Sequence, residues 1–138
     1  MRILCLDVGD KNIGIALSDP TLSIAQAFKL FKRNSYKKDL LELKHIIEEN
    51  DVQKIVIGLP KDLNGGIGKR AEMVMEFADG LKHFINLPVE FWDERFSSNE
   101  AHRVFEMAQV SHKKRKPFID MIASQLILQG YLDAQKKG

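Results

Sequence analysis

Three acidic positions lie where the sequence predicts that a strand ends or a helix begins. Asp7 closes an apolar run near the start of the chain, and Asp120 falls in the first turn of an expected helix. The adjacent pair Asp93 and Glu94 closes a later strand. Carboxylate oxygens are the ligands that Mg²⁺ or Mn²⁺ prefers. Two such ions held roughly 3.5–4 Å apart can activate a water and stabilise the leaving oxygen when a phosphodiester is hydrolysed.

Each acid also has an explanation that involves no chemistry. An acid after a strand is often a solvated turn residue, and the helix dipole favours an acid such as Asp120 in a first helical turn. Asp93, Glu94 and Arg95 together fit a surface ion-pair cluster. The residue types leave these alternatives open, and only the set of acids as a whole indicates a metal site.

The first nineteen residues predict the β-hairpin that carries Asp7. One apolar run covers residues 3–6 and a second covers 13–17, while Gly9 and Asp10 between them indicate a turn. Unbroken apolar runs of this length are typical of strands that are buried on both faces. Asp7 is therefore expected at the open end of a buried strand.

The pattern continues after the hairpin with strand, helix, strand, helix, strand and two helices. We expect strands over residues 24–31, 54–58 and 89–93, and helices over 36–50, 71–86, 97–108 and 117–131. A strand meander followed by strand–helix–strand crossovers predicts an α/β fold with a mixed five-stranded sheet and helices on both faces. Ligands bind at the carboxyl ends of strands in such sheets, so we expect the acids to share one edge.

The composition is that of an ordinary folded domain. The 138 residues fit a single domain, 1–138, that can bury a core. A net charge of +2 is compatible with nucleic acid but too small to require it, so local clusters must decide. The single cysteine, Cys5, excludes a disulfide framework and is expected to be a small buried hydrophobe. With no membrane-length apolar run and no signal-peptide pattern, we expect a cytoplasmic protein without a membrane partner.

Basic residues collect at two places that could meet phosphate. The glycine-rich residues 59–68 lead into Lys69 and Arg70 at a predicted helix start, where we expect a contact with backbone phosphate. Leu63 and Arg70 occupy positions where a P-loop requires glycine and serine or threonine, so the segment is not a P-loop. A solvated flexible loop explains these residues equally well.

The second place is the charge run 112–116, which leads directly into the helix that bears Asp120. Phosphate held there would lie close to the acids and would make binding dependent on salt. A solvated charge stretch is the simpler alternative. A further basic patch follows the third strand, and it comprises Lys32, Arg33, Lys37 and Lys38.

These motifs resemble, in order and over essentially the whole chain, those of the YqgF (RuvX) family of Holliday-junction resolvases, also described as pre-16S ribosomal RNA nucleases. The resemblance is carried by residues 7–19, 58–65 and 93–98, and by Lys116 and Asp120 with the helix that follows them. Two positions depart from the family pattern: Asn12 stands where arginine is typical, and Ser124 replaces the second of two alanines.

The resemblance implies a ribonuclease H-like fold and Mg²⁺- or Mn²⁺-dependent cleavage of structured RNA or branched DNA. Processing of the 5′ end of pre-16S ribosomal RNA is the first expectation, and resolution of Holliday junctions is the alternative. Asp7, Glu94 and Asp120 would be the catalytic acids and metal ligands. The expected nucleic-acid contacts are Lys11, Lys69, Arg70, Arg95, Lys113, Lys114, Arg115 and Lys116.

The second of the three acids is an open point. Better-studied nucleases of this fold place it at the end of the strand beside the first strand, where this chain has the sequence Gly-Leu-Pro at 58–60. We therefore expect Glu94, from the next strand over, to supply it. Asp93 and Asp62 are the alternatives.

Two other classes of function fit parts of the sequence. A nucleotide-binding module of the actin/hexokinase type also has an Asp-x-Gly hairpin, although that fold needs two such domains around a cleft. A non-catalytic nucleic-acid-binding protein, whose acids merely terminate strands, is the other alternative. A junction resolvase would be a two-fold dimer, whereas an RNA-trimming nuclease can be a monomer, and the sequence leaves monomer and homodimer open.

Overall fold

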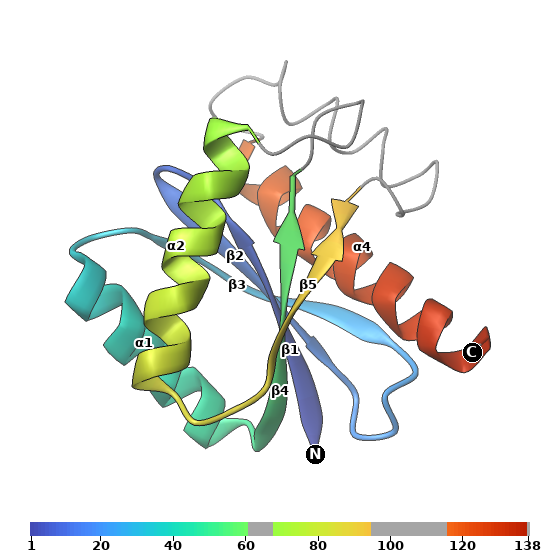
Figure 1. Ribbon diagram of the computed structural model, residues 1–138. Coiled ribbons are helices and arrows are strands. Elements are labelled where there is room, and N and C mark those ends of the chain that lie inside the picture. The colour runs from blue at the N-terminus through green and yellow to red at the C-terminus, as the bar shows by residue number, and fades with distance from the viewer. Residues whose placement is uncertain (61–67, 95–115, 138) are drawn as a thin grey trace.

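The computed structural model describes residues 1–60, 68–94 and 116–137, with only the backbone of 116–120 and of 137 (Figure 1). The elements, in chain order, are β1 (Arg2–Val8), β2 (Asn12–Ser18), β3 (Ala25–Lys32), α1 (Tyr36–Glu49), β4 (Val52–Leu59), α2 (Lys69–Phe84), β5 (Val89–Asp93) and α4 (Lys116–Lys137). These elements match the predicted order wherever the structure describes the chain. The helix expected over 97–108 lies outside the described residues.

The five strands form one mixed sheet in the order β3-β2-β1-β4-β5. β1 pairs antiparallel with β2, and β2 pairs antiparallel with β3. β4 runs parallel to β1 on its other side, and β5 runs parallel to β4. The predicted α/β fold with a mixed sheet is therefore confirmed, and the carboxyl ends of β1, β4 and β5 point to the same edge (Figure 1).

Helices cover both faces of the sheet (Figure 1). Because side chains alternate along a strand, β1 sends Leu4, Leu6 and Val8 into the core under α1 and α2, and Ile3 and Cys5 into the core under α4. Cys5 is completely buried, as expected for a small hydrophobe. We call these two sides of the sheet the α1/α2 face and the α4 face.

The long helix α4 buries a stripe that overlaps only in part with the apolar side that its sequence predicts, which comprises Ile119, Ile122, Ala123, Leu126, Ile127 and Tyr131. Ala123, Ile127 and Tyr131 are buried as that pattern predicts, whereas Ile122 and Leu126 are half-buried and Leu128 and Leu132 are fully covered. Ser124 is also buried, and its hydroxyl is satisfied because it donates to the carbonyl of Met121 over 2.7 Å. The helix is rotated relative to its apolar pattern so that positions 124, 128 and 132 face the sheet.

A polar cluster links the edge strand β5 to α4 and β4. The Tyr131 hydroxyl donates to Glu90 Oε2 over 2.6 Å and also contacts Lys54 Nζ, which lies 2.7 Å from the same Glu90 oxygen. The Trp92 ring meets the Tyr131 ring edge to face at 5.5 Å between centroids. We call Lys54, Glu90 and Tyr131 the β5 clasp, because they join three elements at the amino-terminal part of that strand.

Among the helices of the described segments, none is both long enough and apolar enough to cross a membrane.

Candidate active site

Asp7 lies at the carboxyl end of the central strand β1, on the α4 face of the sheet. It is the penultimate residue of that strand, and the alternation of side chains places it on the same face as Ile3 and Cys5. Only 14% of its side chain is exposed. The predicted strand-end acid is thus in place, with its carboxylate mostly removed from water.

Glu94 directly follows β5, and its carboxylate lies beside Gly58 of the intervening strand β4. In the register of these two strands Gly58 is paired with Trp92, two residues before Glu94. A Cβ atom added to Gly58 would lie 3.0 Å from Glu94 Oε1 and 2.9 Å from Ile127 Cδ1. Because these contacts are so close, a side chain at residue 58 would displace the Glu94 carboxylate or the end of the Ile127 side chain, and glycine leaves both in place over β4.

The two carboxylates influence each other electrostatically. Burial, followed by the negative charges of Asp7 and Asp93, raises the pKa of Glu94 to about 7, and the charge of Arg70 opposes that rise. Burial also raises the pKa of the Cys5 thiol, and the charges of Asp7 and Glu94 add to that effect. Two crowded carboxylates of this kind are an arrangement that a divalent cation would relieve.

Asp93 belongs to the opposite face of the sheet. Its neighbour on that face, Phe91, packs against the core of the α1/α2 face, whereas Trp92 packs on the α4 face. The side chains of this strand therefore alternate between the two faces of the sheet. Of the two adjacent acids, Glu94 is the one that shares the α4 face with Asp7.

Asp120 lies near the start of α4, the helix that covers the face carrying Asp7 and Glu94. By helical periodicity its position continues the row of Ala123 and Ile127, and both of these residues are buried against the sheet. Its side chain is outside the described atoms. Among the side chains that the structure does describe, no three His, Cys, Asp or Glu residues form a metal-binding group.

The donors in hand nevertheless suit a hard cation. Asp7 and Glu94 offer carboxylate oxygens at the edge where the three parallel strands end, and the backbone of Asp120 enters the same side of the sheet. Oxygen ligands of this kind fit Mg²⁺ or Mn²⁺ better than zinc.

Arg70 provides a positive charge beside Asp7. It lies in the first turn of α2, its Nη2 is 3.9 Å from Asp7 Oδ1, and its side chain is 57% exposed. Lys69 beside it and Lys11 in the β1–β2 turn are exposed. These three of the expected nucleic-acid contacts therefore lie in reach of solvent, and Arg70 also borders the acids.

The other expected contacts are not described. Arg95, Lys113, Lys114 and Arg115 lie outside the described residues, and Lys116 is the first residue of α4 with no side chain described. Asp62, an alternative to Glu94 as the second acid, also lies outside the described residues.

Two residues matter more than the sequence indicates. In the sequence Gly58 looks like part of a loop motif. It leaves room for the Glu94 carboxylate only because β4 pairs with β5, and no local sequence pattern predicts that pairing. Arg33 reads as part of a basic surface patch, yet only 19% of its side chain is exposed.

Sequence comparisons give close relatives along the full length. The chain is 50% identical over 137 residues to a protein of Thermoanaerobacter pseudethanolicus named "Putative pre-16S rRNA nuclease", and the match covers 99% of each chain. A protein of Clostridioides difficile with the same name is 52% identical over 132 residues, which cover 96% of this chain and 94% of the relative.

Structural comparisons give more distant relatives of the same fold. T. thermophilus RuvC, solved in complex with a Holliday junction substrate, matches with a TM-score of 0.61 and 10% identity, over 98% of this chain and 96% of that one. The fowlpox virus resolvase, solved with junction DNA, matches with a TM-score of 0.55 and 15% identity, over 98% and 99% of the two chains. At these identities the likeness concerns the fold alone, and it confirms the predicted ribonuclease H-like architecture.

A family model described as "RuvX: Holliday junction resolvase" matches residues 1–134. Together with relatives that share about half of their residues with it along nearly its whole length, this match shows that the chain belongs to the RuvX family.

Proposed function

We propose that this protein is a metal-dependent endonuclease that hydrolyses phosphodiester bonds in structured nucleic acid. Asp7, Glu94 and Asp120 would hold the divalent ions. The observation that carries the proposal is the position of the Glu94 carboxylate over Gly58, on the same face of the sheet as Asp7. An acid supplied from β5 would thereby replace the one that β4 lacks.

Mg²⁺ or Mn²⁺ in this site would activate the attacking water and stabilise the leaving oxygen. The chain's own part is to hold the acids rigidly and to keep the substrate in place. Asp7 sits on the central strand, where it is paired with Gly14 of β2 and directly follows Leu6, which is paired with Ile57 of β4. Arg70, next to Asp7 and more than half exposed, is placed to neutralise a phosphate oxygen of the bound strand.

We propose the 5′ end of pre-16S ribosomal RNA as the substrate. This choice follows the names of relatives that are 44–52% identical to the chain, whereas the junction-bound structural neighbours are only 10–15% identical. Branched DNA is the second candidate, and the description of the family as a Holliday junction resolvase favours it.

The test compares three substrates side by side: a pre-16S ribosomal RNA precursor, a four-way DNA junction and a linear duplex. We expect Mg²⁺-dependent cleavage of the RNA at a defined site, abolished by EDTA. Asp7→Asn and Glu94→Gln should each remove it. Asp10→Asn, which changes an exposed acid in the same hairpin, is the matched control and should cleave like the unchanged protein.

Three outcomes would contradict the proposal in whole or in part. If Asp7→Asn cleaves as fast as the unchanged protein, the assigned site is wrong, and salt-sensitive binding without cleavage would indicate a non-catalytic nucleic-acid-binding protein. Symmetric cutting of the junction alone would instead identify a resolvase. Such cutting requires two active sites related by a two-fold axis, so the mass of the protein in solution should be measured alongside.

A further inference from the structure

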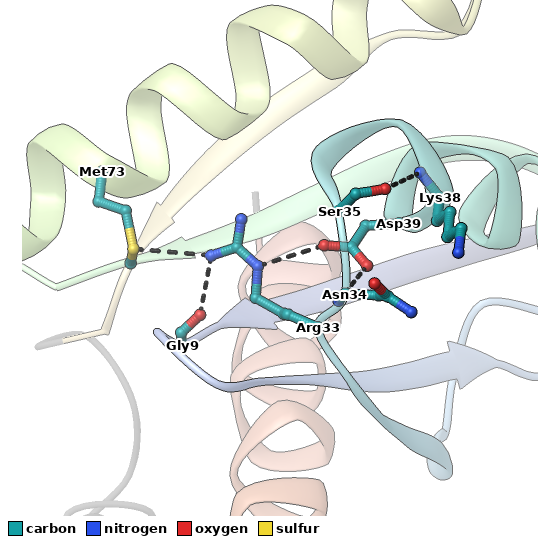
Figure 2. A network of polar contacts seen from close by, with 7 residues as sticks. All are labelled: Gly9, Arg33, Asn34, Ser35, Lys38, Asp39 and Met73. Atoms are coloured by element: carbon teal, nitrogen blue, oxygen red, sulfur yellow. Dashed lines mark hydrogen bonds and ion pairs between the residues drawn. The ribbon is translucent and has the colours of Figure 1, made fainter.

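The guanidinium of Arg33 lies at the centre of a polar network between four elements (Figure 2). Arg33 directly follows β3, and its Nη1 donates to the carbonyl oxygen of Gly9 over 3.0 Å. The same nitrogen lies 3.7 Å from the sulfur of Met73 in α2. The guanidinium also stands over the ring of Phe77 at 5.2 Å from the ring centroid.

Asp39 holds the other side of this guanidinium. Its side chain is only 3% exposed and lies in the first turn of α1, with Oδ2 3.5 Å from Arg33 Nε. Its second oxygen accepts from the backbone N–H of Asn34 over 2.9 Å. A buried carboxylate, a carbonyl and an aromatic ring therefore fix one planar group, which makes Arg33 a structural arginine and not a free surface cation.

The elements that Arg33 joins are those that carry Asp7 and Arg70. Gly9 lies two residues after Asp7, in the turn that follows β1. Met73 and Phe77 follow Arg70 by three and seven residues, a spacing that places all three on one side of α2. Asp7 and Arg70 form an ion pair at 3.9 Å. Arg33 connects the two elements that carry them, because it contacts Gly9 after β1 and Met73 and Phe77 in α2.

We propose that Arg33 is a positioning residue that sets the separation between Asp7 and Arg70. A planar guanidinium can donate to Gly9 and Asp39 at once while it stacks on Phe77, whereas a lysine ammonium cannot reproduce that combination. The connection that Arg33 makes between the β1–β2 turn and α2 exists without metal or substrate and can be tested without them. The effect of this connection on cleavage rests on the proposed function, so the connection and its effect are tested by separate measurements.

The first measurement follows amide hydrogen exchange of Arg33→Lys without metal or substrate. The Gly9 amide, which donates to Asn12 O, reports on the turn, and the Glu72 amide, which donates to Gly68 O, reports on the start of α2. We expect both to exchange on the order of tenfold faster, while amides of the interior strand β4 stay protected. Equal acceleration at every amide would mean a general loss of stability and would overturn the proposal.

The matched control is Lys29→Gln. Lys29 pairs with Glu42 over 2.7 Å and also joins β3 to α1, but both side chains are exposed, and among the described residues neither forms a hydrogen bond or ion pair with the turn or with α2. We expect its two reporter amides to exchange as in the unchanged protein. If Arg33→Lys does not fold, Asp39→Asn serves in its place, because it keeps the shape of the partner and removes its charge.

The second measurement is steady-state cleavage by the same variants. A small displacement of catalytic groups lowers turnover more than substrate affinity, so we expect kcat of Arg33→Lys to fall by roughly 10- to 100-fold with KM nearly unchanged. Unchanged kcat together with unchanged exchange would refute a positioning role. If the unchanged protein does not cleave at all, the proposed function fails, and amide exchange alone still decides the role of Arg33.

Discussion

The Glu94 carboxylate of this protein occupies the space in which residue 58 would carry a side chain. Glu94 Oε1 lies 3.0 Å from the position of a Cβ on Gly58. Glu94, which follows the edge strand β5, can therefore approach Asp7 on the central strand β1, although β4 between them carries glycine at this point. The absence of an acid from the end of β4 and the presence of glycine at position 58 therefore belong together, because both leave space for the carboxylate of Glu94.

Gly58→Ala should damage the site more than the fold. The added methyl must push Glu94 and Ile127 aside, and overpacking of this kind costs about 1–3 kcal/mol in the free energy of unfolding. Because the displaced carboxylate is a proposed metal ligand, we expect cleavage to fall by at least roughly tenfold. Cleavage rates and urea unfolding of the same preparation measure the two effects.

Gly80→Ala is the matched control for that variant. A Cβ on Gly80 would collide with the Tyr36 side chain, which is 47% exposed and belongs to α1. Stability is therefore expected to change while cleavage does not. Loss of cleavage in both variants would show that activity follows stability and not the space beneath Glu94.

Glu94→Gln should stabilise the metal-free protein at high pH. The folded state raises the pKa of Glu94 from 4.5 to about 7, so the folded protein binds this proton more tightly than the unfolded chain does. The unchanged protein then loses stability as the pH rises from about 4.5 to 7, by up to about 3 kcal/mol. Urea unfolding in EDTA should find Glu94→Gln the more stable protein at pH 8 and nearly equal at pH 5.

Glu90→Gln should change the stability of the protein at high pH in the opposite direction. Hydrogen bonds from Lys54 and Tyr131 lower the pKa of Glu90, so its ionised form adds stability above its ordinary pKa that is lost on acidification. This variant should be less stable than the unchanged protein at pH 8. A pH dependence of the same sign in both variants would contradict the local electrostatic explanation.

Binding of Mn²⁺ should strengthen as the pH rises from 6 to 8. A cation must displace the proton that Glu94 holds with a pKa of about 7, and this competition weakens binding in acid. Calorimetric titration of the protein without nucleic acid should show the trend. Glu94→Gln should bind more weakly and lose the pH dependence in this range, and an unchanged profile would remove Glu94 from the ligand set.

Arg70→Gln should weaken binding of nucleic acid and make it less sensitive to salt. Each phosphate contact contributes close to one unit to the slope of log K against log salt, so the slope should fall by roughly one. Filter binding of the RNA precursor at several salt concentrations measures it. Lys82→Gln, at the opposite end of the same helix, is the control that should leave the slope unchanged.

Local patterns predict the elements of this fold well. The strand over 89–93 is observed with the predicted bounds, and Ser35 caps α1 by accepting from the Lys38 amide over 3.2 Å. For Asp19, the acid that follows β2, the explanation as a turn residue is correct. Asp19 accepts from the amides of Ser23 and Ile24 over 2.8 and 2.7 Å, and these bonds lower its pKa.

The parts of the site that the sequence does not predict depend on contacts between distant residues. Arg33 looks like one of several surface cations because its partners Gly9 and Phe77 are 24 and 44 positions away in the sequence. The choice between Asp93 and Glu94 depends on which face of β5 packs against which helix. The buried stripe of α4 is predicted only in part for a similar reason, since the rotation of the helix is set by the sheet beneath it.

The position of Glu94 also sets how the site comes apart. β5 has five residues and, within the described part of the chain, pairs with β4 alone. The β5 clasp secures its amino-terminal part, and Glu94 follows its other end. Edge strands fray at lower free energy than a central strand. Mild warming or dilute urea should therefore dismantle the pair of Asp7 and Glu94 while the core is still folded, and activity assayed beside circular dichroism would be lost first. The fraction of molecules with an assembled site is therefore set by the local opening of β5, which is a separate equilibrium from global unfolding.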